Sequence, residues 1–568
     1  MMSRVFHQPY EPFAYAVSED RARIVLQVQP GVTKDISIHF GDRYEHGGFN
    51  FSTTMNFSGF DGTYDYYVAD LSIPSRRLKY VFEVEFEVTT LWYGESGLSA
   101  SAEAAGVFQL AYLAVGDLFT VPEWVGQSVG YQVFPDRFAK GTTSPTRRGL
   151  ARWNSKPTPS GVFGGDLQGI LEHLDYLDDL GVNLLYVTPI FASHSNHKYD
   201  TTDYYSIDAQ FGTKEDLSKL VKEAHRRGIK VMLDAVFNHS GSQFKPFQDV
   251  IDKGMGSKYY DWFFVHGEYV DMQTVNYETF ATQIASMPKL NVANPAVEEY
   301  LLSVASYWIE ECDIDGWRLD VANEVDHVFW RKFRDRVKKA KENALIIGEV
   351  WHNSLPWLKG DQFDGVMNYV FRERMLQFFV RQNTSAQTFA ESLVKLLHQY
   401  PAAATRSMFN LLGSHDTERV LTLAQDMELV KRMFTVQFTY PGIPMVYYGD
   451  EVGMFGGADP DCRRGMVWEE TKQNQELKRT VQALAALRRQ RPAFGSNNFE
   501  VVAVTEFALE YRRWSEEAGD VVHVAINNGV EDFSLSCQGT ILFTTGPGRV
   551  HTQSLVGLSA LIWSPDVS

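Results

Sequence analysis

The sequence is poor in cysteine and in positive charge. Only three of its 568 residues are cysteines, Cys312, Cys462 and Cys537, and no two of them form a Cys-x-x-Cys pair. The chain therefore carries neither a disulfide framework nor a cysteine-based zinc signature. Its 53 Lys and Arg residues are outnumbered by 71 Asp and Glu residues, for a net charge of −18. This balance argues against a nucleic-acid partner and against an anionic membrane surface, because both require compensating cations.

Long apolar runs are missing as well. No stretch has the length that spans a bilayer, and residues 1–9 (MMSRVFHQP) lack the apolar core of a secretory signal. We therefore expect a soluble, cytoplasmic protein. The chain is instead rich in aromatic residues, at 14%. Aromatic faces stack on flat apolar ligands such as sugar rings, although most large aromatic side chains fill protein cores.

The residue pattern predicts three domains. In residues 1–122, polar and apolar residues alternate at 23–29 and again at 78–88 with no helical period between them, which predicts a β-sandwich. Residues 123–491 alternate between strand and helix patterns, and we expect them to form the catalytic domain. Residues 492–568 return to strand patterns, at 499–504, 521–526 and 539–543, and predict a small antiparallel β domain.

The middle domain contains eight candidate strands, mostly with a helix between neighbours, such as one at residues 166–180. This arrangement predicts a closed (β/α)₈ barrel. The gap between the third and fourth strands is too long for one helix, so residues 240–295, rich in Tyr, Phe and Met, form an insertion. The strands are expected at residues 129–134, 182–187, 231–236, 316–321, 344–350, 363–369, 407–412 and 443–448.

Acidic residues occur at the carboxyl ends of three of these strands, where such barrels carry their chemistry. They are Asp320 on the fourth strand, Glu349 on the fifth and Asp416 on the seventh. Two carboxylates on one rim suit glycosidic hydrolysis, in which one donates a proton and the other attacks the anomeric carbon. A retaining mechanism needs the two groups about 5–5.5 Å apart, a spacing that neighbouring strands can provide.

The residues around this pair suggest how the two roles divide. Arg318 lies two positions before Asp320, so both side chains share a strand face, and the guanidinium would keep Asp320 ionised as a nucleophile. Glu349 has apolar neighbours in sequence, which would raise its pKa toward general-acid use. Metal-assisted hydrolysis is the competing idea, but residues 234–239 (DAVFNH) lack the His-rich spacing that zinc needs.

Four segments of the domain resemble the motif blocks of the α-amylase family, glycoside hydrolase family 13. They are residues 234–239, 316–324 (GWRLDVANE), 348–351 (GEVW) and 412–416 (LGSHD). Two further segments, residues 287–291 (MPKLN) and 321–324 (VANE), resemble its neopullulanase, cyclomaltodextrinase and maltogenic amylase branch. That branch has an extra amino-terminal domain. The predicted sandwich, with its residues 92–95 (WYGE) and the following entry segment 134–138 (FPDRF), resembles this domain.

The resemblance implies roles for individual residues. Asp320 corresponds to the nucleophile, Glu349 to the acid/base, and Asp416 to a third carboxylate that binds ring hydroxyls and favours substrate distortion. The residues expected around the sugar at the cleavage point are His239, Arg318, His415 and Tyr199, of which Tyr199 stacks on the ring. Asp459 and Arg463 match residues that hold the next sugars on the non-reducing side. Trp351 and aromatic residues of the insertion, those at 259–264 among them, are expected on the leaving-group side.

One departure from the family concerns calcium. Relatives often carry an Asn/Asp-rich calcium loop just after the segment that matches residues 134–138. Here the corresponding residues 139–148 (AKGTTSPTRR) contain no acid and three cations. Calcium prefers anionic oxygen ligands, so we expect none at this loop, and we expect Asp166 to cap a helix instead. No cofactor is expected.

By this resemblance we expect a retaining hydrolase that cuts α-1,4 bonds of cyclodextrins, maltodextrins or pullulan by double displacement, with some transglycosylation. The branch also implies a homodimer that binds its substrates between the barrel and a partner's amino-terminal domain. One alternative is a glucan transferase or isomerase of the same family. Another is a non-catalytic sugar-binding or transporter-associated protein; such proteins typically lose a carboxylate and carry a membrane segment, whereas this sequence keeps all three acids and has no span.

Overall fold

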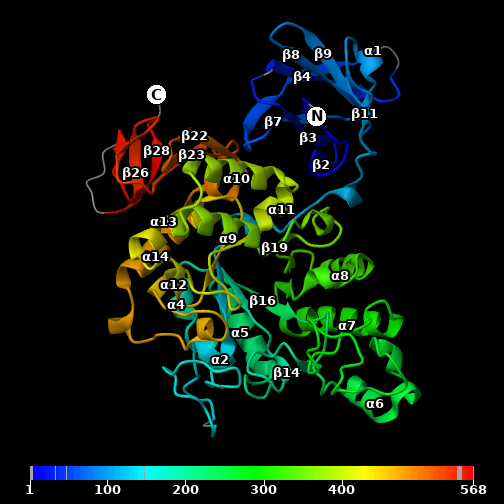
Figure 1. Cartoon of the computed structure of the whole chain (residues 1–568), viewed down its shortest axis with the longest axis vertical. Coiled ribbons are helices and arrows are strands. Elements are labelled where there is room, and N and C mark those ends of the chain that lie inside the picture. The colour runs from blue at the N-terminus through cyan, green and yellow to red at the C-terminus, as the bar shows by residue number, and fades with distance from the viewer. Residues whose placement is uncertain (1–3, 32, 46–47, 146, 547–552, 567–568) are drawn as a thin grey trace.

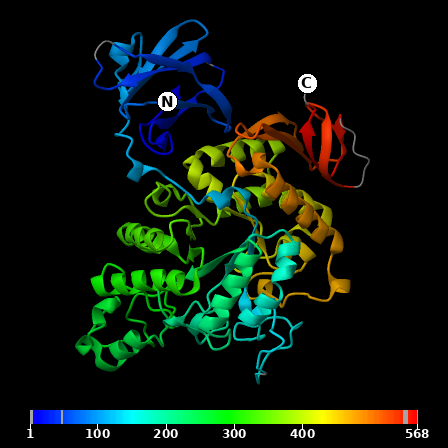
Figure 2. The same cartoon turned by 180° about the vertical axis from the view of Figure 1, so that it is seen from behind.

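The computed structural model describes residues 4–31, 33–45, 48–145, 147–546 and 553–566. Residues 1–3 of the amino-terminal segment and Thr146 of the 139–148 loop, both used in the predictions above, lie outside these ranges. A barrel forms the middle of the molecule. The amino-terminal sandwich and the carboxy-terminal domain lie side by side at one end, and the insertion lies at the opposite end (Figures 1 and 2).

The amino-terminal domain is the predicted sandwich of two antiparallel sheets. Alternating apolar residues of β3 and β8, such as Ile24 and Phe82, fill the core between the sheets. One sheet has the order β1 (Val5–Phe6), β3 (Arg21–Val28), β7 (Asp65–Ser72), β6 (Asn56–Phe60), with β2 (Ala14–Ser18) also paired to β3. The other has the order β10 (Gly97–Ser99), β9 (Thr90–Gly94), β8 (Leu78–Phe86), β4 (Thr33–Asp42), β5 (Phe51–Thr54), with β11 (Phe108–Gln109) paired to β8.

The eight predicted barrel strands form one parallel sheet. A parallel bridge between Met367 and Phe409 joins its two edge strands and closes it, which confirms the barrel. Apolar side chains such as Leu184, Ile347 and Met445 pack in an interior cluster. In spatial order the strands are β19 (Gly365–Val366), β18 (Leu345–Gly348), β17 (Gly316–Leu319), β16 (Lys230–Ala235), β13 (Leu184–Val187), β12 (Gly130–Val133), β21 (Ile443–Tyr447) and β20 (Phe409–Leu411).

Helices surround the barrel, and one of them differs from its prediction. The single helix expected at residues 166–180 is wrong: the structure has two helices, α3 (Leu167–Glu172) and α4 (Leu174–Asp179), which meet at His173. His173 leaves helical geometry, with φ −111° and ψ 14°, and its Nδ1 lies 2.7 Å from the Gly169 carbonyl oxygen. Asp166 caps α3 as expected, because its side chain accepts from the Gly169 N–H.

The remaining helices of the barrel region are mostly amphipathic and bury one face against the strands. They are α2 (Pro135–Phe138), α5 (Lys214–Arg226), α7 (Pro295–Cys312), α8 (His327–Ala340), α9 (Tyr369–Met375), α10 (Ala386–His398), α11 (Ala402–Ser407), α12 (Val420–Ala424), α13 (Met427–Thr439), α14 (Gln475–Gln490) and α15 (Pro492–Gly495). A further short helix, α1 (Ala102–Ala105), belongs to the sandwich.

Two excursions leave the barrel after its second and third strands. The predicted insertion follows β16 and contains α6 (Lys245–Lys253) and short turns of 3₁₀ helix. Antiparallel bridges, among them His239 with Lys289, attach it to the segment that follows β16. The other excursion, a hairpin of β14 (Phe191–Ser193) and β15 (Thr201–Ile207), was not predicted. Both excursions therefore stand over the rim where the candidate carboxylates were expected.

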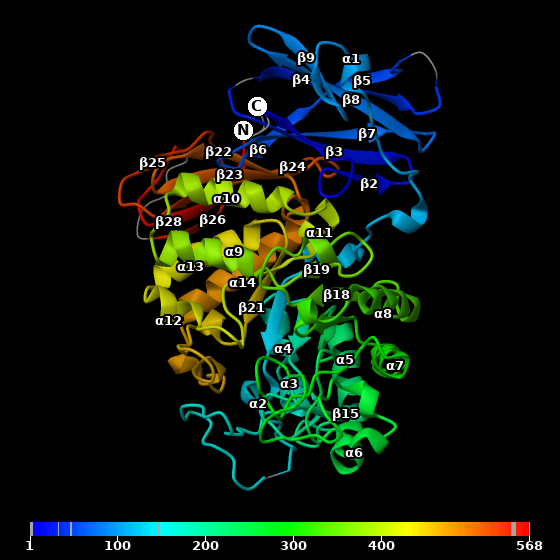
Figure 3. The same ribbon diagram turned by 45° about the vertical axis from the view of Figure 1, so that its right-hand side comes forward.

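The carboxy-terminal domain is antiparallel, as predicted, and packs against both the sandwich and the barrel helices (Figure 3). The sandwich contacts the barrel helices below it through a hydrogen bond between Ser58 and His398 and one from the Ala402 N–H to Tyr15. No helix among the described residues is long and apolar enough to cross a membrane. The main sheet of the carboxy-terminal domain has the order β22 (Phe499–Val504), β23 (Ala508–Ser515), β24 (Asp520–Asn527), β28 (Ser559–Pro565), β26 (Gly539–Thr545). In the same domain, β25 (Phe533–Ser534) pairs with β27 (Ser554–Leu555).

Candidate active site

A cleft of about 440 Å³ opens at the carboxyl ends of the barrel strands. Of the site residues predicted individually, it contains all except Arg318 and His415, which are fully buried and bonded to residues that line it. Segments that are far apart in sequence thus meet at one place. The lining consists of His197, Tyr199, His239, Phe280, Met287, Asp320, Val321, Asn323, Glu349, Trp351, Asp416, Asp459 and Arg463.

Arg318 at the end of β17 holds three carboxylates together. Its Nη1 donates to Asp320 Oδ1 at 2.8 Å and lies 3.1 Å from both carboxylate oxygens of Asp234. Its Nη2 lies 2.9 Å from Glu349 Oε2. Arg318 and Asp320 therefore point to the same side, as expected, and contact each other. A single buried guanidinium also links the ends of three adjacent strands, β16, β17 and β18.

The electrostatics at Asp320 differ from the expectation. Burial raises its pKa well above the usual value, and this effect exceeds the lowering caused by Arg318. The nearby charges of Glu349 and Asp234 raise the pKa further. Burial also raises the pKa of Asp234 to about 6, against the opposing effect of Arg318. Arg318 thus lowers the pKa of Asp320, as expected, but burial and the charges of Glu349 and Asp234 together raise it by more.

The surroundings of Glu349 are polar. Its Oε2 accepts from the Val321 N–H at 3.0 Å and pairs with Arg318, while its Oε1 accepts from Trp351 Nε1 at 3.1 Å. The apolar residues that precede it in sequence, such as Ile347, pack among buried hydrophobic side chains and make no part of the cleft lining. The apolar environment that the sequence suggested for this carboxylate is therefore not what the fold provides.

Arg463 organises the outer part of the cleft. Its Nη2 lies 3.2 Å from Asp416 Oδ1 and its Nη1 lies 3.0 Å from Asp459 Oδ1. Its Nε donates to the His415 carbonyl oxygen at 2.8 Å. The side chain of Asp459 is 48% exposed, so this residue lies at the rim, whereas that of Asp416 is 29% exposed and lies deeper.

Tyr199 and His415 form a rigid wall of the cleft. Their rings lie parallel, with 5° between the planes and 5.5 Å between the centroids, and the Tyr199 hydroxyl lies 2.6 Å from His415 Nε2. Gln132 Nε2 lies 2.7 Å from His415 Nδ1 and donates to it, so the ring proton is on Nε2 and points to the tyrosine. Tyr199 in turn donates to Asp234 Oδ2 at 3.0 Å. Burial lowers the pKa of His415 well below its usual value, which keeps this chain of donors neutral.

The aromatic residues of the insertion contribute differently from the prediction. Phe280 lines the cleft and stacks on His239, with centroids 4.9 Å apart. Residues 259–264 are not part of the lining. Instead, Trp262 packs on Tyr300, with centroids 5.6 Å apart, and Phe263 packs on Phe247 at 4.8 Å. The 259–264 cluster is therefore absent from this lining: Trp262 and Phe263 pack inside the insertion, and Phe264 is 38% exposed.

The two branch motifs, residues 287–291 and 321–324, touch each other beside the cleft. Lys289 Nζ donates to the Glu324 carbonyl oxygen at 3.0 Å and lies 3.3 Å from Glu324 Oε2. The same ammonium binds the side chain of Asn238. Lys289 therefore fixes the insertion to the loop that follows β17. Met287 and Asn323, from the same two motifs, line the cleft.

Several cleft residues were missed by sequence reasoning. Asn323 lies inside the 316–324 motif and His197 lies two positions before Tyr199, so these settings could have identified them. Met287 likewise opens the 287–291 motif. Phe280 belongs to the insertion aromatics that were expected at the site, although nothing in the sequence distinguishes it from the others. The group as a whole offers a close carboxylate pair, a third acid and aromatic faces, which suits acid/base and nucleophilic chemistry at an acetal carbon of an uncharged sugar.

Comparison with known proteins agrees with this chemistry. Residues 132–498 match the family model for the alpha amylase catalytic domain, and residues 1–114 match that for the alpha amylase N-terminal ig-like domain. The chain is 47% identical over 538 residues to a cyclomaltodextrinase from Geobacillus thermopakistaniensis, which covers 93% of this chain and 91% of the relative. It is 47% identical over 494 residues to neopullulanase 2 from Thermoactinomyces vulgaris, with 86% and 84% covered. A solved cyclomaltodextrinase structure superposes with a TM-score of 0.92 at 40% identity over 99% of both chains.

Proposed function

Because this chain belongs to the α-amylase family, we propose that Asp320, Glu349 and Asp416 carry out retaining hydrolysis of α-1,4-glucosidic bonds by double displacement. The chain is an α-glucan hydrolase of the branch that includes cyclomaltodextrinases, maltogenic amylases and neopullulanases. The family supplies the reaction class. The roles of individual residues rest on the geometry of the cleft.

In the proposed first step, Glu349 protonates the glycosidic oxygen while Asp320 attacks the anomeric carbon. In the second step, Glu349 removes a proton from water, and this water releases the sugar from Asp320. The observation that carries this assignment is the bridge through Arg318, which holds Asp320 at 2.8 Å and Glu349 at 2.9 Å on the two ends of one guanidinium. Such a bridge favours the close carboxylate spacing of retaining enzymes over the wider spacing of inverting ones.

Asp416 is proposed to bind the hydroxyls of the sugar ring in which the bond breaks. It faces the cleft from the end of the seventh strand and is anchored by Arg463. Tyr199 presents its ring beside His415 and supplies an apolar face on which that sugar can stack. Trp351 is half exposed, is bonded to Glu349, and supplies a second face, on the proposed leaving-group side.

Replacement of the proposed nucleophile and acid tests the mechanism. The Asp320→Asn variant is expected to lose turnover while still binding a maltodextrin in calorimetry. The Glu349→Gln variant is expected to recover activity on a maltosyl fluoride, because fluoride leaves without protonation. The matched control is Asp459→Asn at the rim, which should change KM more than kcat. Full turnover by Asp320→Asn would overturn the assignment. A β-anomer as the first product, seen by NMR, would overturn the retaining stereochemistry.

The proposed substrates are short or cyclic α-glucans. Aromatic side chains form part of the cleft wall and offer uncharged faces to a neutral sugar. The cleft is also small, which fits short oligosaccharides better than a long polymer. The names of the relatives point to cyclomaltodextrins and pullulan. Parallel product analysis on cyclodextrin, pullulan and starch ranks these substrates. An added sugar acceptor measures the proposed transglycosylation, since longer products appear only if the acceptor competes with water.

We also propose a homodimer in which the amino-terminal sandwich of one copy lies near the cleft of the other. The sequence motifs of the branch support it. Sedimentation equilibrium should then give a mass of about twice the 64.6 kDa of one chain. A monomer at micromolar concentration, with unchanged activity on cyclodextrin, would contradict the dimer.

For calcium, we propose that the loop at residues 139–148 binds none. The carboxylates beside it are committed to protein donors. Glu172 accepts from the N–H and the hydroxyl of Thr142, at 3.0 and 2.8 Å. Asp166 accepts from the N–H groups of Gly141 and Gly169, at 3.0 and 2.7 Å. Asp136 accepts from the N–H groups of Phe163 and Gly164 and from its neighbour Arg137. Such bonds leave few anionic oxygens for a dication, so the residues at this loop do not fit a calcium site.

A further inference from the structure

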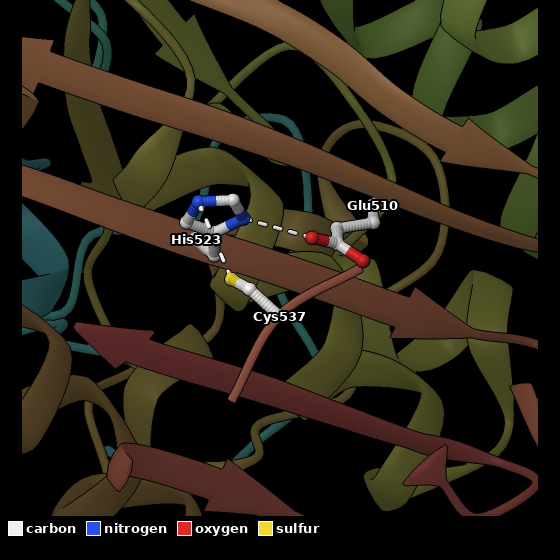
Figure 4. A group of neighbouring side chains, drawn as sticks. All are labelled: Glu510, His523 and Cys537. Carbon is white, nitrogen blue, oxygen red and sulfur yellow. Dashed lines mark hydrogen bonds and ion pairs between the residues drawn. The ribbon is translucent and has the colours of Figure 1, made fainter. Parts of the chain in front are cut away.

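A second group of chemically active side chains lies in the carboxy-terminal domain, apart from the cleft. Glu510 on β23, His523 on β24 and Cys537 in the loop between β25 and β26 lie next to one another (Figure 4). His523 Nδ1 lies 2.8 Å from Glu510 Oε1, and His523 Nε2 lies 3.7 Å from Cys537 Sγ. The imidazole thus stands between a carboxylate and a thiol.

The sheet places the acid and the imidazole on one face. His523 pairs with Arg512 in the β23–β24 register, and Glu510 lies two residues from Arg512, so all three share that face. On the other side of His523, Trp563 of β28 packs its ring 5.2 Å away. Arg512, the cation of this face, is paired with Glu500 at the exposed edge. The charged group that contacts the imidazole is therefore Glu510.

Glu510 is fully buried, and its carboxylate is saturated with donors. Its Oε2 accepts from the Ser536 N–H at 2.9 Å, and its Oε1 accepts from the Ser536 hydroxyl and from His523. A buried carboxylate bonded in this way fixes the histidine with its proton on Nδ1. The lone pair of Nε2 then points to the Cys537 thiol. Because its oxygens are occupied, Glu510 serves as an orienting group, and it is poorly placed as a metal ligand.

We propose that Cys537 is an activated thiol that exchanges with low-molecular-weight disulfides. His523 Nε2 accepts the thiol proton, and the imidazolium that forms lies between the thiolate and Glu510. The thiolate attacks one sulfur of the disulfide, a new S–S bond forms to Cys537, and the old S–S bond breaks. The departing thiolate takes the proton from His523. Cys537 is then the nucleophile, His523 the proton acceptor and Glu510 the orienting acid. Proteins activate cysteine by such an arrangement.

The other two cysteines lack this arrangement and serve as internal controls. Cys312 is buried next to Ser218, and burial raises its pKa. Cys462 is buried, donates to the His415 carbonyl oxygen, and has its pKa raised by burial to about 12. Cys537 is half-buried, so it alone combines access with a neighbouring imidazole. A native protein should therefore expose one fast-reacting thiol.

An adduct on Cys537 would affect the domain that carries it. The cysteine lies against an apolar cluster between the main sheet and the β25–β27 hairpin, and that cluster includes Phe533, Leu555 and Trp563. A bulky disulfide substituent cannot enter this cluster without moving its members. We therefore expect modification to lower the melting temperature of the protein while leaving kcat for glucan hydrolysis unchanged at moderate temperature.

The test is the rate of reaction of the native full-length chain with 5,5′-dithiobis(2-nitrobenzoate). One equivalent should react rapidly, and it should be absent in Cys537→Ser. A free thiol is only a few per cent ionised at pH 7, so loss of the proton acceptor in His523→Asn should slow the reaction, by about tenfold at pH 6. Glu510→Gln should slow it less, and Ser536→Ala replaces that variant if it fails to fold. Retained glucan hydrolysis shows that each variant is folded.

Two outcomes would overturn the proposal. One is a Cys537 rate equal to that of a small free thiol at every pH in the wild-type protein, a measurement that needs no variant. The other is protection of Cys537 by a single equivalent of Zn²⁺ with micromolar affinity that is lost in both His523→Asn and Glu510→Gln, which would make the group a metal site. A wild-type rate that stays high below pH 7 and falls in His523→Asn supports the activated thiol.

Discussion

The indole of Trp351 lies 3.6 Å from the phenol ring of Tyr369, with only 9° between the two planes. This stack holds Trp351 Nε1 within 3.1 Å of Glu349 Oε1. The half-exposed tryptophan is therefore joined to the proposed acid/base by a hydrogen bond, in addition to offering its face to substrate.

The first prediction separates these two roles of Trp351. Trp351→Phe keeps a ring on Tyr369 but removes the donor to Glu349. Hydrogen bonds to charged groups are worth about 1.5–3 kcal/mol, so kcat should fall on the order of tenfold while KM changes little. Trp351→Ala should in addition raise KM, because the stacking face is lost. Steady-state kinetics on a maltodextrin measures both values. An unchanged kcat in Trp351→Phe would show that the bond does not position the carboxylate.

The second prediction concerns Arg318. A lysine has one ammonium group and cannot contact Asp234, Asp320 and Glu349 as the guanidinium does. Arg318→Lys should lower kcat by about a hundredfold or more. It should also destabilise the barrel by about 3–5 kcal/mol in urea unfolding, because buried carboxylates lose their partner. The matched control is Arg463→Lys at the outer cleft, where the main change is expected in KM. Near-normal turnover in Arg318→Lys would contradict the proposed bridge.

The third prediction is the acid limb of the pH profile. A carboxyl group with a raised pKa keeps its proton to higher pH, so the ionised fraction of Asp320 declines at a pH above the usual range for aspartate. As pH falls, kcat/KM on a neutral glucan should therefore drop well above pH 4. The charge of Asp234 contributes to this shift, and Asp234→Asn should move the limb to lower pH. A limb at or below pH 4 in the wild-type protein would contradict the raised pKa.

The fourth prediction tests calcium through stability. Because Asp166 and Asp136 already bind protein N–H groups, removal of divalent ions should leave the melting temperature unchanged. Calorimetry with and without a chelator measures this, and added calcium after chelation is the control. A fall in melting temperature that calcium reverses would show that the protein holds a structural calcium ion.

The fifth prediction distinguishes two aromatic residues of the insertion. Phe280→Ala should raise KM for glucans and leave stability nearly unchanged, because Phe280 is half-buried at the cleft wall. Trp262→Ala should leave KM unchanged and lower the free energy of unfolding by about 2 kcal/mol or more, because Trp262 packs on Tyr259 and Tyr300. The reverse result would restore the 259–264 cluster as part of the substrate site.

Much of the fold is predictable from sequence because parallel barrel strands are buried on both faces and appear as short continuous apolar runs. Regular β/α alternation also places their carboxyl ends on one rim, so Asp320, Glu349 and Asp416 could be expected together. The break at His173 could not be predicted. Its cause is local backbone geometry and a ring nitrogen that binds the Gly169 carbonyl, neither of which changes the hydrophobic period.

The sequence by itself determined the succession of β-sandwich, barrel and carboxy-terminal sheet, and it placed three acids at one rim of the barrel. The tertiary structure decided the environment of those acids. The pKa of Asp320 depends on burial and on the charges of Glu349 and Asp234, which come from other strands, so its neighbour Arg318 does not by itself set the direction of the shift. Tertiary structure alone also brings Phe280 to the cleft wall and brings Glu510, His523 and Cys537 together. Their proximity comes from strand pairing and loop packing, and side-chain chemistry depends on distance in space rather than along the chain.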